Sequence, residues 1–231
     1  MMRRIFVIGG LALLLASCSK VGKRFDQRNT GSPGAAQTGT GGTSSGGGGA
    51  TGAGSMSSTD ATDGQAVERP QPTAAQLAAI EGGQEAKWDQ QGITWTVPKG
   101  WVKDRAETTM FTWRSPGGGD YGFLIANVSP LSESFPTDIS LKAMYDQTVE
   151  RKKQGQVEEV RWLELDGVKG VALREAPPEN KEDARRIQWI AYRKYAGQTQ
   201  MLILTLNSTG RSFDKWQDAL YGILYSTKLV H

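Results

Sequence analysis

Few residues of this chain have side chains that could act on a substrate. The sequence contains one cysteine, Cys18, and one histidine, His231, which is also the last residue. A nucleophilic triad needs a base held beside its nucleophile, and a base at a chain end is poorly held. Zinc sites of the usual kind need several cysteine or histidine ligands. We therefore expect a non-catalytic protein with no metal and no cofactor.

Carboxylates are the remaining candidates for acid–base catalysis. Glu158, Glu159 and Glu164 fall in a predicted strand, and Asp166 lies in the turn that follows. Strand alternation predicts Glu158 and Glu164 on one face and Glu159 on the other, solvent-facing side. A glycosidase needs two carboxyl groups that flank the bond to be cleaved. Solvated strand faces explain these residues better than a catalytic pair does.

The N-terminus has the plan of an export signal. Two arginines, Arg3 and Arg4, precede an apolar run over residues 5–16, which is too short to span a bilayer comfortably. Residues 1–17 are therefore predicted to be a cleaved signal peptide. At the end of the run, four residues indicate which class of signal peptide this is: Leu15, Ala16, Ser17 and Cys18.

These four residues resemble the lipobox of bacterial lipoproteins. The resemblance implies that Cys18 carries a diacylglycerol on its sulfur, that cleavage falls just before it, and that the new N-terminus is acylated, for example with palmitate. Several buried acyl chains make a lasting membrane anchor, at about 0.8 kcal/mol per buried CH₂. The expected location is the cell envelope, and Ser19 favours the periplasmic face of the outer membrane if there are two membranes. The alternative is an ordinary signal peptide with a chance cysteine.

The segment after the lipobox predicts a flexible tether over residues 18–70. It is rich in glycine, serine and threonine, as residues 41–49 illustrate, and it cannot bury enough apolar area to offset the entropy of ordering. About 50 residues of such a coil span roughly 40 Å. Residues 71–87 predict a short helix or linker, with Thr73 as its cap and Gly82 as its stop.

The composition changes at Trp88, because all seven tryptophans and all six tyrosines lie at or beyond it. Residues 88–231 therefore predict one globular domain. The continuously apolar residues 201–204 predict a central strand covered on both faces, and Asp166-Gly167 predicts a two-residue hairpin turn. The expected elements are strands at 93–97, 110–113, 121–128, 157–165, 168–175, 186–195 and 200–207, with helices at 140–154 and 213–225.

This order predicts an α+β fold, in which an antiparallel sheet of about six to seven strands is flanked by helices in an α/β/α sandwich. The turn Val97-Pro98-Lys99-Gly100-Trp101, the mid-chain helix, the hairpin strands and the closing aromatic helix resemble the PsbP-like superfamily. That group includes PsbP of photosystem II, the Ran-binding Mog proteins and bacterial DcrB-type lipoproteins. The resemblance implies a non-enzymatic protein-binding or assembly role. The metal-binding histidines proposed for some members have no counterpart in this domain.

Charge and aromatic content give two hypotheses for the function. The net charge is only +3, which argues against a nucleic-acid partner. The leading hypothesis is an envelope lipoprotein that is held to membrane lipid through Cys18 and binds an unidentified envelope protein. The alternative is small-ligand or glycan binding at a tryptophan-rich surface. We expect most of the tryptophans near the first strands to be core, but two exposed together would form such a patch: Trp88, Trp95, Trp101 and Trp113.

Overall fold

The computed structural model describes residues 66–230 with the exception of residue 118. The predicted signal peptide, the lipobox with Cys18, and the predicted tether up to residue 65 lie outside the described residues. His231 lies outside them as well.

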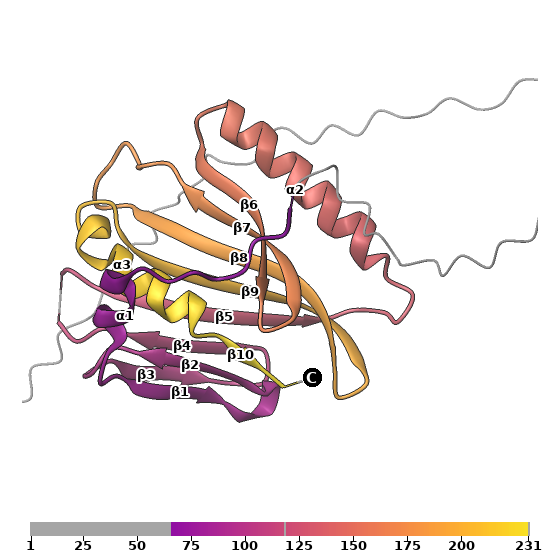
Figure 1. Cartoon of the computed structure of the whole chain (residues 1–231), viewed down its shortest axis with the longest axis horizontal. Helices are drawn as coiled ribbons and strands as arrows, with labels where there is room; N and C mark the ends of the chain where they lie inside the picture. Colours follow the sequence, from indigo (N-terminus) through magenta and orange to yellow (C-terminus); the bar gives the residue numbers. More distant parts are fainter. Residues whose placement is uncertain (1–65, 118, 231) are drawn as a thin grey trace, which may run out of the picture. The chain divides into compact units, whose positions relative to one another are not determined.

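A seven-stranded antiparallel sheet is the centre of the domain (Figure 1). Its spatial order is β3-β4-β5-β9-β8-β7-β6, so β9 is the central strand. This sheet confirms the predicted α+β class and strand number. The strands are β3 (Val102–Ala106), β4 (Met110–Arg114), β5 (Gly122–Pro130), β6 (Val157–Leu165), β7 (Val168–Glu175), β8 (Ala184–Tyr195) and β9 (Gln198–Thr209).

Two tight hairpins fix the register of this sheet. Asp166 and Gly167 have φ angles of 46° and 83°, and Ala196 and Gly197 have φ angles of 49° and 80°. Positive φ at both central residues is the type I′ geometry, whose twist matches that of the flanking strands. The turn predicted at Asp166-Gly167 is confirmed.

A second, smaller sheet packs over one face of the first. It consists of β1 (Gln84–Trp88), β2 (Ile93–Val97) and β10 (Lys228–Leu229), and a 3₁₀ turn, η1 (Asp89–Gln91), joins β1 to β2. The apolar side of β2 reaches the main core, where Trp95 stacks on Phe111 with ring centroids 5.4 Å apart. The sequence pattern predicted β2 but not that it belongs to a separate sheet.

Helices cover both faces of the main sheet. On one face α2 (Thr137–Lys153) packs on β6, β7 and β8, and on the other α3 (Phe213–Tyr225) packs on β8, β9 and β5. Neighbouring residues of β6 show this division, because Trp162 packs with α2 whereas Leu163 belongs to the larger core with α3. This arrangement confirms the predicted helix–sheet–helix layers.

The folded domain begins before Trp88, the predicted boundary. Helix α1 (Ala74–Ile80) has Thr73 as its N-cap and packs on α3, where Gly222 leaves room for it. A helix of this length is marginal in water, so the docking stabilises it. Within residues 66–117 and 119–230, no helix is both long and apolar enough to cross a membrane.

Candidate functional site

The four tryptophans singled out in the sequence do not form an exposed patch. Trp88, Trp95 and Trp101 are at most 3% exposed, and Trp113 is half-buried beside Phe111. The indole N–H of Trp88 donates a 2.8 Å hydrogen bond to the main-chain carbonyl of Glu107, which satisfies its one polar atom. The rings of Trp88 on β1, Trp95 on β2 and Trp113 on β4 all lie against Phe111. Trp101 packs edge-on against Trp216 of α3. The aromatic-patch hypothesis is therefore corrected: these side chains are core.

The carboxylates of β6 take part in an ion-pair cluster between the sheet and α3. The pairing of β6 with β7 shifts register between Val157 and Glu159, which marks a β-bulge. As a result both Glu158 and Glu159 contact Arg174, at 3.0 and 3.5 Å. The expectation that they lie on opposite faces was wrong, because an extra residue in the strand breaks the alternation.

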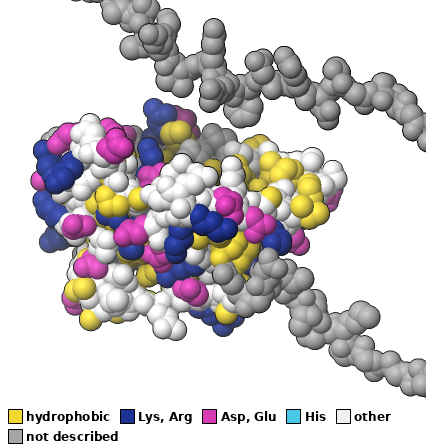
Figure 2. All heavy atoms as spheres, turned by 90° about the horizontal axis from the view of Figure 1, so that it is seen from above, with side chains coloured by type: hydrophobic (Ala, Val, Ile, Leu, Met, Phe, Trp, Pro, Cys, Tyr) yellow, Lys and Arg dark blue, Asp and Glu magenta, His cyan; other side chains and the backbone are white. Residues whose placement is uncertain are grey.

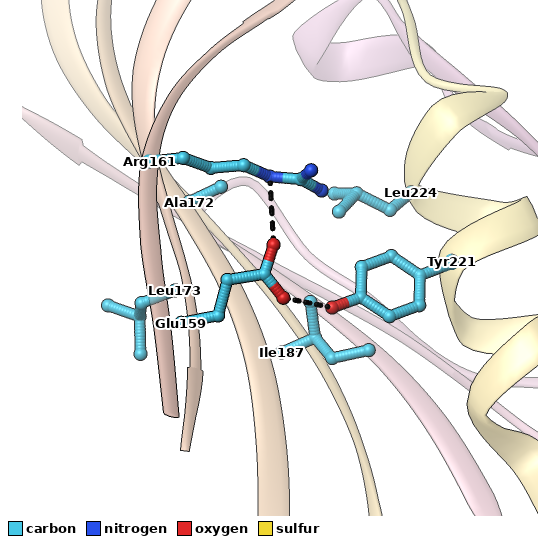
Figure 3. Close-up of a pocket in the computed structure, with 7 residues that line it drawn as sticks. All are labelled: Glu159, Arg161, Ala172, Leu173, Ile187, Tyr221 and Leu224. Carbon is cyan, nitrogen blue, oxygen red and sulfur yellow. Dashed lines mark hydrogen bonds and ion pairs between the residues drawn. The ribbon is translucent and has the colours of Figure 1, made fainter. Parts of the chain in front are cut away.

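Glu159 lies at the centre of this cluster (Figure 3). Its carboxylate pairs with the guanidinium of Arg161 at 3.3 Å and accepts a hydrogen bond from the Tyr221 hydroxyl at 3.3 Å. Arg161 also donates to the hydroxyl of Tyr225 at 2.5 Å. Burial, together with the negative charge of Glu159, raises the pKa of Tyr221 above its ordinary value. Every polar group of this set is paired to a neighbour.

The hollow beside Glu159 is too small for a ligand. It has no space for the centre of a water molecule, and its walls are the side chains drawn in Figure 3. Glu158 is held by Arg185 at 2.5 Å, so the two glutamates face arginines and do not flank an empty cleft. The cluster ties β6 and β7 to α3 and is a structural element. Elsewhere in the described chain, no group of three or more His, Cys, Asp or Glu residues could hold a metal ion.

The main sheet has a more open region on the α2 side. In β5, the side chains of Leu124 and Ala126 are buried in the larger core, so Phe123 and Ile125 point to the opposite face. Both of these side chains are half-buried. Helix α2 packs on β6, β7 and β8. The part of the same face that is formed by β4, β5 and β9 lies beside the helix and not beneath it.

The central strand β9 shows the same division. Leu202 and Leu204 are fully buried in the core, but Met201 and Ile203 on the other face are only half-buried. Residues 201–204 were predicted to be covered on both faces of the sheet. That prediction was wrong for one of the two faces, the one that carries Met201 and Ile203. We call the partly exposed apolar region of this side the open sheet face: Met110, Phe123, Ile125, Ile190, Met201 and Ile203.

The strand register makes the open sheet face continuous. Ile203 lies opposite Ile190 on one side and Asn127 on the other, and Ile125 lies opposite Thr205. The Gln188 amide donates to the Thr205 hydroxyl at 3.0 Å between the apolar side chains. Such a mixture of apolar, hydroxyl and amide groups is typical of non-obligate protein interfaces. The sequence analysis did not predict this face, because the position of α2 on β6, β7 and β8 decides which part of the sheet stays open.

The charges on the surface do not favour a single sign. Figure 2 shows Lys and Arg side chains interspersed with Asp and Glu on the face it presents. Ion pairs account for many of them, such as Arg186 with Glu175 at 3.1 Å and Lys142 with Asp146 at 3.1 Å. On the face that Figure 2 presents, the positive charges do not gather into the broad basic patch that is typical of nucleic-acid-binding surfaces.

Comparisons with known proteins bear on this fold. A scan against protein-family models finds no match, and a search of the curated proteins finds none either. Among solved structures, cyanobacterial PsbP (CyanoP) from Synechocystis is 12% identical, with 64% of this chain and 92% of that chain covered and a TM-score of 0.43. The Ran-binding protein Mog1p of Saccharomyces cerevisiae is 12% identical, with 64% and 95% covered and a TM-score of 0.39.

A third solved structure is similar over the same share of the chain. LpqN of Mycobacterium tuberculosis, a protein involved in cell envelope biogenesis, is 15% identical, with 64% of this chain and 86% of that chain covered and a TM-score of 0.47. These likenesses concern the fold alone.

Proposed function

We propose that this protein is a lipid-anchored envelope lipoprotein whose folded domain binds another protein as a non-catalytic accessory or assembly factor. The open sheet face is the observation that carries the binding role. The lipobox at Leu15, Ala16, Ser17 and Cys18 supports the anchor, with the acyl chains on Cys18 in membrane lipid.

A protein partner suits the open sheet face better than a small molecule does. Small-ligand sites are concave and enclose most of the ligand's surface. The open sheet face is instead an extended array over three strands and part of a fourth, with polar groups of Asn127, Thr205 and Gln188 among the apolar ones. Glycan binding at the four tryptophans is not retained, because three of them are buried.

The predicted tether supports an accessory role at a membrane. A coil of about 50 residues reaches roughly 40 Å from its anchor. The domain can then meet partners that stand well above the lipid surface. This reach favours a partner in the envelope space over a lipid headgroup.

Crosslinking of the full-length protein in its native cells tests this proposal. We expect one dominant attached protein that depends on the anchor, so that a Cys18→Ser variant loses both membrane attachment and the crosslink. Ile203→Lys places a charge on the open sheet face and should weaken the crosslink several-fold. Ile139→Lys, on the outer surface of α2 where Ile139 is 73% exposed, is the matched control and should leave it unchanged.

Equal crosslinking of the Ile203→Lys and Ile139→Lys variants would contradict the role of the open sheet face. Unchanged membrane attachment of Cys18→Ser would contradict the anchor. The two parts of the proposal are thus tested separately.

A further inference from the structure

The chain's own N-terminal segment occupies the outer edge of β6. Glu68 forms a parallel bridge with Leu163, and its main-chain N–H donates to the carbonyl of Trp162 at 3.0 Å. In return the N–H of Glu164 donates to the carbonyl of Glu68 at 2.8 Å. We call residues 67–69 the strap. Figure 1 shows the chain running from this edge to α1.

The strap makes side-chain contacts that are specific to its sequence. Val67 packs against the small core of α2, which includes Tyr145 and Trp162. The carboxylate of Glu68 pairs with Arg161 at 3.0 Å. The edge therefore offers an apolar slot, a cation and two main-chain groups in a fixed order.

Arg161 is held in place without the strap. It pairs with Glu159 at 3.3 Å and donates to the Tyr225 hydroxyl at 2.5 Å, and both partners belong to the ion-pair cluster of β6 and α3. When Glu68 leaves, the guanidinium stays oriented toward the same edge. A receptor site that keeps its geometry binds a new carboxylate at low cost in entropy.

The strap itself is weakly held. A single residue pairs with β6 through its main chain. The two ion pairs of the strap, Glu68 with Arg161 and Arg69 with Glu164 at 3.1 Å, use strap side chains that are 52% and 78% exposed. Exposed ion pairs contribute little, and segments with few buried contacts open locally long before the domain unfolds. An edge strand whose cover opens presents free N–H and C=O groups to another chain.

We propose that the edge of β6 is a strand-addition site for an extended peptide of a partner protein, and that the strap occupies this site in cis. The peptide that fits carries a branched apolar residue followed directly by a carboxylate, as Val67 and Glu68 do. Its main chain takes over the hydrogen bonds to Trp162 and Glu164, which is the β-augmentation mode of recognition. This site is separate from the open sheet face and does not depend on its role.

A Glu68→Pro substitution in the full-length protein, held in detergent micelles, tests the proposal. Proline has no N–H to donate to Trp162, so the strap detaches and the edge opens. The probe is a fluorescent peptide with the sequence of residues 64–72. We expect it to bind Glu68→Pro at least about tenfold more tightly than the wild type, measured by fluorescence anisotropy.

Two controls make the result specific. Gln71→Pro introduces the same residue outside the strap and should bind the peptide as weakly as the wild type. A peptide with aspartate in place of the valine of position 67 should lose its affinity for Glu68→Pro, because a charge cannot enter the slot beside Trp162.

Hydrogen exchange at the Glu164 amide reports directly whether the edge of β6 is open. We expect this amide to exchange faster in both Glu68→Pro and Val67→Asp, and to be protected again when the peptide is added. An exposed amide with no peptide binding would overturn the proposal. Wild-type dimers that the peptide dissociates would assign the edge to the strap of a second copy, and would overturn it as well.

Discussion

Tyr221 illustrates how single side chains in the ion-pair cluster affect the whole fold. Its hydroxyl lies between Glu159 and Arg174, with oxygen–oxygen and oxygen–nitrogen distances of 3.3 and 3.4 Å. Burial is the largest cause that raises its pKa, and the charge of Glu159 adds to it. Burial also raises the pKa of Tyr225 and of Tyr192. The protein therefore keeps these phenols neutral at a pH where an unfolded chain ionises them.

A Tyr221→Phe substitution should make the protein less sensitive to alkaline pH. The folded state holds the Tyr221 proton above its ordinary pKa of 10.0. Above that pH the folded state thus binds more protons than the unfolded chain, and the free energy of unfolding falls as pH rises. The loss amounts to at most about 1.4 kcal/mol per pH unit for one group. Phenylalanine removes this contribution.

Urea unfolding at about pH 9 and about pH 11 measures the effect against the wild type. The variant loses the hydrogen bond to Glu159 at both values, at a cost of about 1 kcal/mol. The difference between the two proteins should then shrink as pH rises. A difference that stays constant would contradict the account of Tyr221.

The sequence was least informative about the direction in which single side chains point. Alternation is a rule about regular strands, and the bulge between Val157 and Glu159 breaks it at the two glutamates that matter most for the cluster. The four tryptophans were expected to be mostly core, and the burial of Trp88, Trp95 and Trp101 fits the common outcome for large aromatic side chains.

At the scale of elements, the strongly patterned segments were predictable and the weakly patterned ones were not. The closing helix was expected at residues 213–225, and α3 has those bounds. In contrast, β3 is exposed along its whole length and carries Lys103, Asp104 and Arg105, so no hydrophobic period marks it. Strand β1 buries only Ala86 and Trp88. Both strands exist because a neighbouring strand offers hydrogen-bonding groups, which no local pattern reveals.

The docking of α1 on α3 depends on one glycine. A Cβ atom at Gly222 would lie 2.6 Å from the carbonyl oxygen of Gln76 and 3.0 Å from the Ile80 side chain. Helix propensity alone predicts that Gly222→Ala stabilises α3 by about 1 kcal/mol. We predict the opposite sign, because the carbonyl of α1 must move away and the short helix loses its support.

Hydrogen exchange and thermal unfolding together check this prediction. In Gly222→Ala the amides of α1 (Ala74–Ile80) should exchange markedly faster and the melting temperature should fall. Gly155→Ala serves as a control for glycine replacement outside the contact: it has space around its Cβ, but its φ of 74° makes alanine strained by its own backbone. Gly155→Ala should therefore leave the amides of α1 protected from hydrogen exchange. Unchanged exchange in α1 of Gly222→Ala would contradict the packing argument.

In the part of the chain that the structure describes, two sheets and three helices leave one region of the main sheet partly exposed. The sequence predicted the layers because amphipathic helices and an antiparallel sheet pack in few ways. It did not predict the open sheet face, because Met201 and Ile203 look the same in sequence as the buried Leu202 and Leu204. Only the position of α2 over β6, β7 and β8 distinguishes them.

The proposed function makes the open sheet face the surface that binds the partner protein. The most direct measurement is site-specific photo-crosslinking of the full-length protein in its native cells, with a photoreactive amino acid in turn at Ile125, Ile203 and Ile139. We expect one discrete crosslinked partner from Ile125 and Ile203 and none from Ile139 on the outer surface of α2. Crosslinks of equal yield at all three positions, or from Ile139 alone, would contradict it.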